Sequence, residues 1–175
     1  MKFTSTESIK ALEHAQAREK EAYEFYETCS DAARITGTKA VVTLLVDEEK
    51  KHYSLVSDML AQARQNSQPG DTTIAGIENP KKILEKSFGH EHIGDFSAEK
   101  ASVIDMLRTA LKNEEESYTL YSEAERAVEE EEAASVYHFL AGEENKHYIM
   151  IGNLLEYLDD PGKWLYEEEN VIFRR

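Results

Sequence analysis

The chain has 175 residues, of which 41% are hydrophobic and 31% are charged, and its formal net charge at pH 7 is -15. This length fits one domain with a sizeable core. The negative charge disfavours nucleic acids and anionic membranes as partners. No apolar signal core stands near the first residue and no run approaches a membrane span, so we expect a soluble, cytoplasmic protein.

The composition favours an all-α protein. The helix formers Ala, Leu, Glu and Lys dominate, whereas there are only 8 glycines and 3 prolines. The one cysteine, Cys29, excludes an intramolecular disulfide and a Cys-x-x-Cys metal site. We expect this thiol to be buried or half-buried.

The first part of the chain predicts two helices. The first is expected to begin at Thr4 or Ser5 and to end at Gly37, because glycine readily adopts the left-handed conformation of a helix C-cap. Thr38 can then cap a second helix that runs to about residue 66.

Residues 67–96 interrupt the helical pattern. They contain the turn signal Pro69-Gly70-Asp71, and a short helix is expected from Asn79-Pro80 to about Lys86. A link of this length can carry the chain across a bundle. Two helix pairs joined by one long crossover form the ferritin-like four-helix bundle.

The remaining chain predicts a second helix pair. A third helix is expected from Ser97 to about residue 128, with a tight turn in the acidic run 129–132, and a fourth helix ends at 159–162. We assign residues 1–160 to the bundle and 161–175 to an apolar tail that packs on the bundle or on a partner subunit. The tail and the long crossover together predict a homodimer, with an exchange of helices between subunits as one form.

The two halves are related by a repeat with an offset of 95 residues. Each half contains one Glu-x-x-His motif, Glu49 to His52 and Glu144 to His147, and aligning 44–60 with 139–155 gives seven identities. The same offset relates a second segment, in which Glu19, Glu21, Tyr23 and Tyr26 recur as Glu114, Glu116, Tyr118 and Tyr121. Two segments that share one offset indicate a duplicated helix pair.

Each helix carries one glutamate inside an apolar stripe near its middle, where a charge is costly unless it is paired or bound to metal. Residues three apart share a helix face, so each Glu-x-x-His can offer a carboxylate and an imidazole to one ion. This set suits iron or manganese, and zinc less distinctively. The predicted metal ligands are Glu19, Glu49, His52, Glu114, Glu144 and His147.

The charges of this set match two divalent cations. We expect Glu49 and Glu144 to bridge the two metals, Glu19 and Glu114 to bind terminally, and each histidine to hold one ion. The like charges also predict that Glu49→Gln leaves the metal-free protein as stable or more stable and weakens the metal-loaded protein.

The alternative is a structural bundle with buried ion pairs. It would need Lys51 and Lys146 to turn inward, yet both lie two residues from the glutamates and on another face. The repeated tyrosines are either plain core aromatics or include one that hydrogen-bonds a ligand carboxylate. The other histidines fall outside the ligand face: His14, His138 and the loop residues His90 and His92.

These motifs resemble the rubrerythrin group of the ferritin-like superfamily over roughly residues 5–160. The resemblance rests on Glu19 with Ala22 and Tyr26, on Glu114 with Tyr121, and on the two Glu-x-x-His motifs. It implies a non-haem di-iron site that reacts with hydrogen peroxide or oxygen. The implied catalytic residues are Glu19, Glu49, Glu114, Glu144, Tyr26 and Tyr121.

The sequence departs from that family in two places. Rubrerythrins usually carry a four-cysteine rubredoxin-like iron site, whereas this chain has only Cys29, so electrons must come from an external donor such as a rubredoxin. The family also has a further glutamate on the third helix. Ser117 stands at that position, and Glu115 or Glu116 could replace the ligand only if the helix bulges.

We therefore expect an oxidoreductase with two iron ions that reduces hydrogen peroxide in the response to oxidative stress. One alternative is a ferroxidase that oxidises ferrous iron with oxygen. Another is a metal-binding bundle without turnover, and manganese and zinc are alternative metals.

Overall fold

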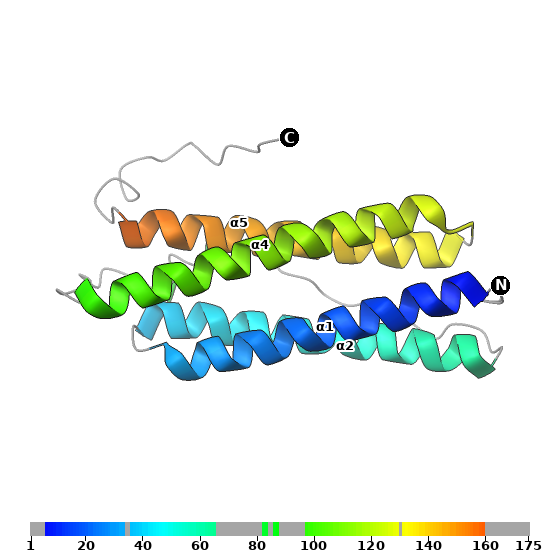
Figure 1. Ribbon diagram of the computed structural model, residues 1–175, viewed down its shortest axis with the longest axis horizontal. Helices are drawn as coiled ribbons and strands as arrows, with labels where there is room; N and C mark the ends of the chain where they lie inside the picture. The colour runs from blue at the N-terminus through cyan, green and yellow to red at the C-terminus, as the bar shows by residue number, and fades with distance from the viewer. Residues whose placement is uncertain are drawn as a thin grey trace.

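The structure is a computed structural model that describes residues 6–33, 36–65, 82–83, 86–87, 97–129 and 131–159. Long helices run along the length of the molecule (Figure 1), and the described residues contain no strand. The all-α prediction is confirmed. The helices are α1 (Thr6–Ala32), α2 (Thr36–Gln65), α4 (Ser97–Ala127) and α5 (Glu131–Asp159).

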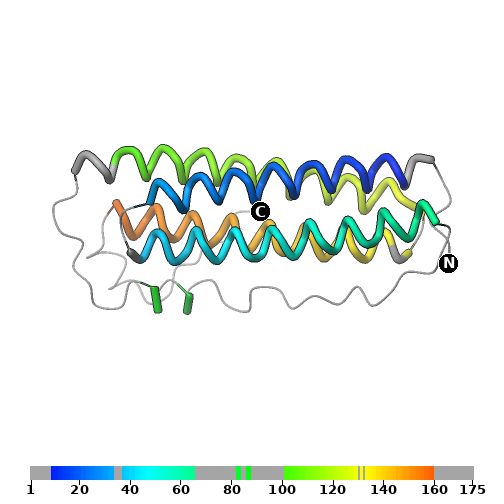
Figure 2. The backbone as a smooth tube through the Cα atoms, turned by 90° about the horizontal axis from the view of Figure 1, so that it is seen from below, coloured from blue at the N-terminus to red at the C-terminus, as the bar shows by residue number. Residues whose placement is uncertain are grey.

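The helices pack as two antiparallel pairs, α1 with α2 and α4 with α5 (Figure 1). Contacts between α1 and α4 and between α2 and α5 close the ring. Helices α2 and α4 thus lie at opposite corners and run in the same direction (Figure 2). The connection between them has to return along the bundle, which is the predicted ferritin-like crossover.

Part of this crossover is described. Residues 82–83 and 86–87 are helical, and the rest of the expected short helix lies outside the described residues. Ile83 is half-buried and packs against the apolar core. The crossover therefore contributes to the bundle's packing.

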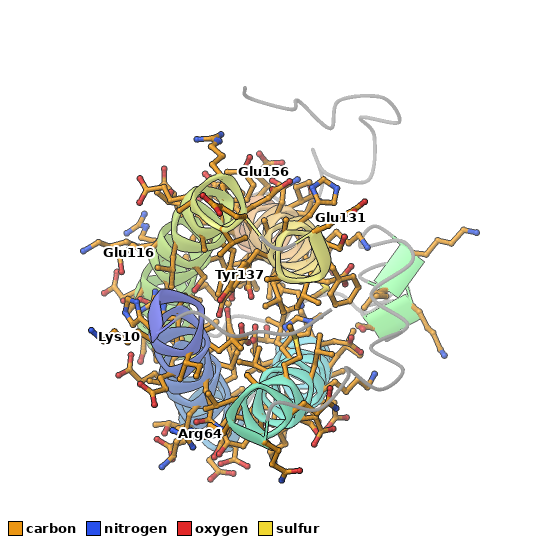
Figure 3. All side chains as sticks on the ribbon, turned by 90° about the vertical axis from the view of Figure 1, so that its right-hand side faces the viewer. Lys10, Arg64, Glu116, Glu131, Tyr137 and Glu156 are labelled. Atoms are coloured by element: carbon orange, nitrogen blue, oxygen red, sulfur yellow. The ribbon has the colours of Figure 1, made fainter. Side chains whose placement is uncertain are left out.

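Two apolar clusters occupy the interior, on either side of the middle of the bundle. In α1, Leu12 and Ala15 belong to one cluster, whereas Tyr26 and Cys29 belong to the other. Glu19 stands between them in the same helix and is buried. The other helices repeat this order, so the bundle has a polar layer between the two apolar clusters. In the view along the bundle, Tyr137 lies inside the ring, whereas Lys10 and Arg64 lie outside (Figure 3).

The turns lie earlier in the sequence than expected. Helix α1 ends at Ala32 and α2 begins at Thr36, so Gly37 and Thr38 lie in the first turn of α2 and neither caps a helix end. Thr38 is fully buried, and its hydroxyl has no hydrogen-bond partner among the described residues.

The second turn lies at the position that the 95-residue repeat predicts from the first turn. Helix α4 ends at Ala127 and α5 begins at Glu131, both 95 residues after their counterparts in the first pair. The Val128 amide bonds the Ala124 carbonyl at 3.1 Å, just as the Ala33 amide bonds the Cys29 carbonyl at 2.9 Å. The acidic run thus supplies both the turn and the start of α5, where negative charge complements the helix dipole.

For two residues, the observed burial can be compared directly with the prediction from the sequence. We expected Tyr118 on the inner face of α4, but its side chain is 45% exposed, so its assignment to the core is wrong. It lies beside the buried stripe of α4 that contains Glu114, Ser117 and Tyr121. Cys29 is buried as expected, and its burial raises the pKa of the thiol to about 11. The predicted tail and its boundary at residue 160 lie outside the described residues.

Candidate metal centre

Each long helix places one carboxylate in the polar layer, and α2 and α5 each add an imidazole. All six predicted site residues are nearly inaccessible, with exposed fractions between 0% and 2%. Their ligand atoms form two groups in which all atoms lie within 4.8 Å of one another. The first group is Glu19, Glu49, His52 and Glu144, and the second is Glu49, Glu114, Glu144 and His147.

Glu49 and Glu144 belong to both groups, which is the arrangement expected of bridging ligands. Around His52, the Nδ1 atom lies 3.4 Å from Glu49 Oε2, 3.5 Å from Glu19 Oε2 and 3.8 Å from Glu144 Oε1. These distances are compatible with an ion between the imidazole and three carboxylates.

The second group repeats this geometry with one difference. The Nδ1 atom of His147 lies 3.5 Å from Glu144 Oε2 and 3.6 Å from Glu114 Oε2. However, it lies only 2.8 Å from Glu49 Oε1, on the opposite helix pair. Glu49 is therefore held more closely by the histidines than Glu144 is.

Two tyrosines form hydrogen bonds between the neighbouring helices α1 and α4. The Tyr26 hydroxyl donates to Glu114 Oε1, and the Tyr121 hydroxyl donates to Glu19 Oε1. The two bonds are equivalent under the repeat. Each fixes one oxygen of a terminal carboxylate and leaves Oε2 facing the histidine. Burial and the neighbouring carboxylates raise the pKa of both hydroxyls well above the usual value, so they keep their protons.

Several buried atoms of the site have no hydrogen-bond partner within the described residues. They include Glu19 Oε2, both oxygens of Glu49 and the ring nitrogens of His52 and His147. Buried polar atoms are normally paired, because an unpaired one costs free energy. Four carboxylates and two imidazoles that converge with open lone pairs fit a pair of bound divalent cations.

The environment shifts the pKa values of the buried carboxylates in different directions. Burial, followed by the charges of its neighbours, raises the pKa of Glu144 well above the usual value, and burial also raises that of Glu19 to about 7. Burial acts in the same direction on Glu49, but the imidazoles of His147 and His52 together hold its pKa well below normal. Without metal, the two histidines keep Glu49 ionised.

The position of the family's additional glutamate contains a different contact. Ser117 is buried, and its Oγ accepts a hydrogen bond from Arg18 Nε at 2.9 Å. Arg18 also donates to the Asn113 carbonyl at 2.9 Å, which ties α1 to α4. Helix α4 is regular here, and Glu115 and Glu116 are exposed. Neither of them replaces the missing ligand.

The lysines of the repeat pair with other glutamates than those of the centre. Lys51 Nζ lies 2.6 Å from Glu48 Oε1, and Lys146 Nζ lies 2.5 Å from Glu143 Oε1. The buried ion pairs of the structural alternative are thus not formed with Glu49 and Glu144. His14 and His138 are exposed.

Sequence reasoning missed Glu48 and Glu143, which are 4% and 2% exposed. Both precede a shared carboxylate of the centre and both are identities in the repeat. That repetition was the available signal, because chance solvated glutamates have no reason to recur at the same offset.

A membrane-spanning segment is not found among the described helices, none of which combines the required length and apolarity. No match was found among curated proteins or among solved structures. The family model described as Rubrerythrin matches residues 10–155. The chain therefore belongs to the rubrerythrin family, and its buried carboxylate–histidine cluster fits a di-iron protein.

Proposed function

We propose that this protein is a non-haem di-iron oxidoreductase that reduces hydrogen peroxide with electrons from an external donor, such as a rubredoxin. The observation that carries the proposal is the pair of ligand groups that share Glu49 and Glu144. Two ions with common carboxylates can deliver two electrons to one substrate. Peroxide reduction requires that number, because one H₂O₂ takes up two electrons and two protons and leaves as two water molecules.

The residues have distinct roles in this proposal. Glu49 and Glu144 would hold both irons, Glu19 and His52 one of them, and Glu114 and His147 the other. When bound, ferrous iron would supply the reducing equivalents for cleavage of the O–O bond. Four carboxylate charges balance two divalent cations, so the loaded centre is close to neutral in a medium where net charge is costly.

The surrounding residues keep the centre ordered. Tyr26 and Tyr121 orient the terminal carboxylates through hydrogen bonds between the neighbouring helices α1 and α4. The apolar clusters on either side limit access of water along the bundle. A fixed ligand set in a dry interior favours a controlled two-electron reaction.

The reaction is tested with the ferrous-loaded protein under argon. We expect stopped-flow mixing with hydrogen peroxide to oxidise the iron faster than mixing with an equal concentration of oxygen. Faster reaction with oxygen together with mineral growth would indicate a ferroxidase. No reaction with either oxidant would indicate a metal-binding bundle without turnover.

The ligand assignment predicts two metal ions per chain and separable losses. His52→Ala should weaken mainly one ion and His147→Ala mainly the other, each by more than the roughly 10–100-fold typical of residues that only support a ligand. His138→Ala, an exposed histidine on α5, is the matched control. Metal analysis and calorimetric titration under argon measure both quantities. Full retention of both ions in either variant would contradict the assignment.

A homodimer remains part of the proposal. The apolar tail and most of the crossover that suggest it lie outside the described residues. Light scattering gives the molar mass in solution, and a strictly monomeric mass at high concentration would contradict it.

A further inference from the structure

A second pair of carboxylates lies beside the centre, on α2 and α5. Glu48 and Glu143 are buried, and we call them the outer carboxylate pair. Their ligand atoms and a ring nitrogen of His52 all lie within 4.8 Å of one another. Neither glutamate belongs to the two central groups, whereas His52 belongs to the first of them.

The lysines that bind the outer carboxylate pair extend to the surface of the protein. Lys51 and Lys146 each bind one Oε1 atom of the pair, and their side chains are 49% and 38% exposed. An ammonium group at that exposure can release its carboxylate and return to water at little cost. The lysines therefore cover the pair without sealing it.

An unsatisfied ligand atom points to a further occupant. Glu48 Oε2 is buried and has no hydrogen-bond partner among the described residues, and the same is true of both ring nitrogens of His52. Lys51 satisfies only the other oxygen of Glu48. A buried carboxylate oxygen beside an imidazole is a suitable place for a divalent cation.

We propose that Glu48, Glu143 and His52 form a transit site at which a divalent cation binds on its way into the centre. The shared histidine explains why the occupancy is transient. Once it has released its proton to an entering cation, the imidazole of His52 has a single nitrogen lone pair, so it can bind a cation at the outer pair or at the centre, but not at both. The transit site therefore serves the ion of the first central group.

The inference rests on the proposed metal centre, and the rate of loading separates the two. Metal-free protein is mixed with Co²⁺ in a stopped-flow instrument, and the visible absorbance of bound cobalt is followed to completion. We expect wild type to bind two ions. The double variant Glu48→Gln/Glu143→Gln should also bind two, with uptake of one ion slowed on the order of tenfold, because a local attraction for cations is lost.

Two further variants make the test specific. Asp47→Asn removes one negative charge at an exposed neighbour of Glu48 on α2 and should load at the wild-type rate. Lys51→Met removes the ammonium that competes for Glu48 and should load faster than wild type. A purely structural ion pair predicts no such opposite effects of its two partners.

Three results would overturn the transit site: unchanged uptake in the double variant, equal slowing of both ions, or slower uptake in Lys51→Met. Unchanged uptake with an altered absorbance of the loaded protein would assign the pair to orienting His52 instead. Failure of wild type to bind two cobalt ions would contradict the proposed centre itself. Thermal melts of the metal-free variants verify folding, and Lys51→Met alone still decides if the double variant does not fold.

Discussion

Replacing Glu144 with glutamine should leave the metal-free protein as stable as wild type or more stable at pH 7. Replacing Glu49 should instead destabilise it by roughly 3 kcal/mol. Both residues are shared by the two ligand groups, so both variants should lose the stabilisation that added metal gives. The two substitutions are thus expected to differ only without metal.

The physical reason lies in the two pKa values. Burial and three neighbouring carboxylates raise the pKa of Glu144, so folding without metal requires its protonation, and glutamine removes that requirement. Glu49 is kept ionised by His147 and His52, with His147 Nδ1 at 2.8 Å. Replacing Glu49 with glutamine removes the negative charge that is paired with the buried imidazoles of His147 and His52. This corrects the expectation that Glu49→Gln relieves the metal-free protein, because the structure assigns that relief to Glu144.

Urea unfolding at pH 7, with chelator and with ferrous iron under argon, measures both effects. Glu156→Gln, an exposed substitution on α5, is the control and should change neither state. Equal destabilisation of the metal-free protein by Glu49→Gln and Glu144→Gln would show that both carboxylates belong to one structural ion-pair network.

The metal-free protein should lose stability as the pH rises from about 5 to 9, whereas the metal-loaded protein should not. Burial raises the pKa of Glu19 from 4.5 to about 7. Burial lowers the pKa of His52, but Glu19 and Glu49 outweigh it and raise the pKa from 6.5 to about 9. In both cases the folded state binds more protons than the unfolded state.

The sign follows from these shifts. The contribution of Glu19 is lost as the pH rises from 4.5 to about 7, and that of His52 as it rises from 6.5 to about 9. Each can amount to about 3 kcal/mol. Glu49 acts in the opposite direction, because its lowered pKa costs stability only as the solution becomes acidic. Metal binding needs deprotonated ligands, so the affinity for metal rises with pH.

Urea unfolding at several pH values between 5 and 9 checks this prediction, with chelator and with metal. The repulsion of a chain with a net charge of -15 also grows with pH. Glu19→Gln tests the local effect, because it should reduce the slope below pH 7 and, since Glu19 helps to raise the pKa of His52, part of the slope above it. A flat profile of the metal-free wild type would contradict the pKa shifts.

The sequence alone determined the helical class and the repeat, and it predicted the six residues that the structure brings together. Helical periodicity placed Glu19 and its three counterparts in apolar stripes, and a buried charge demands a partner. The offset of 95 then tied the four helices into one pattern. Such stripes can be read from the sequence because the side-chain direction along a helix is a local property.

Only the tertiary structure decided the relations between helices. The crossed bonds of Tyr26 and Tyr121, the closer hold of His147 on Glu49 and the burial of Glu48 all depend on which helix lies beside which. Glu48 and Glu49 are consecutive residues of α2, so their side chains point in different directions. From the helix alone, we would expect Glu49 to be buried and Glu48 to be exposed. Glu48 is nevertheless buried, and it lies beside Glu143 of α5, outside the central stripe of α2.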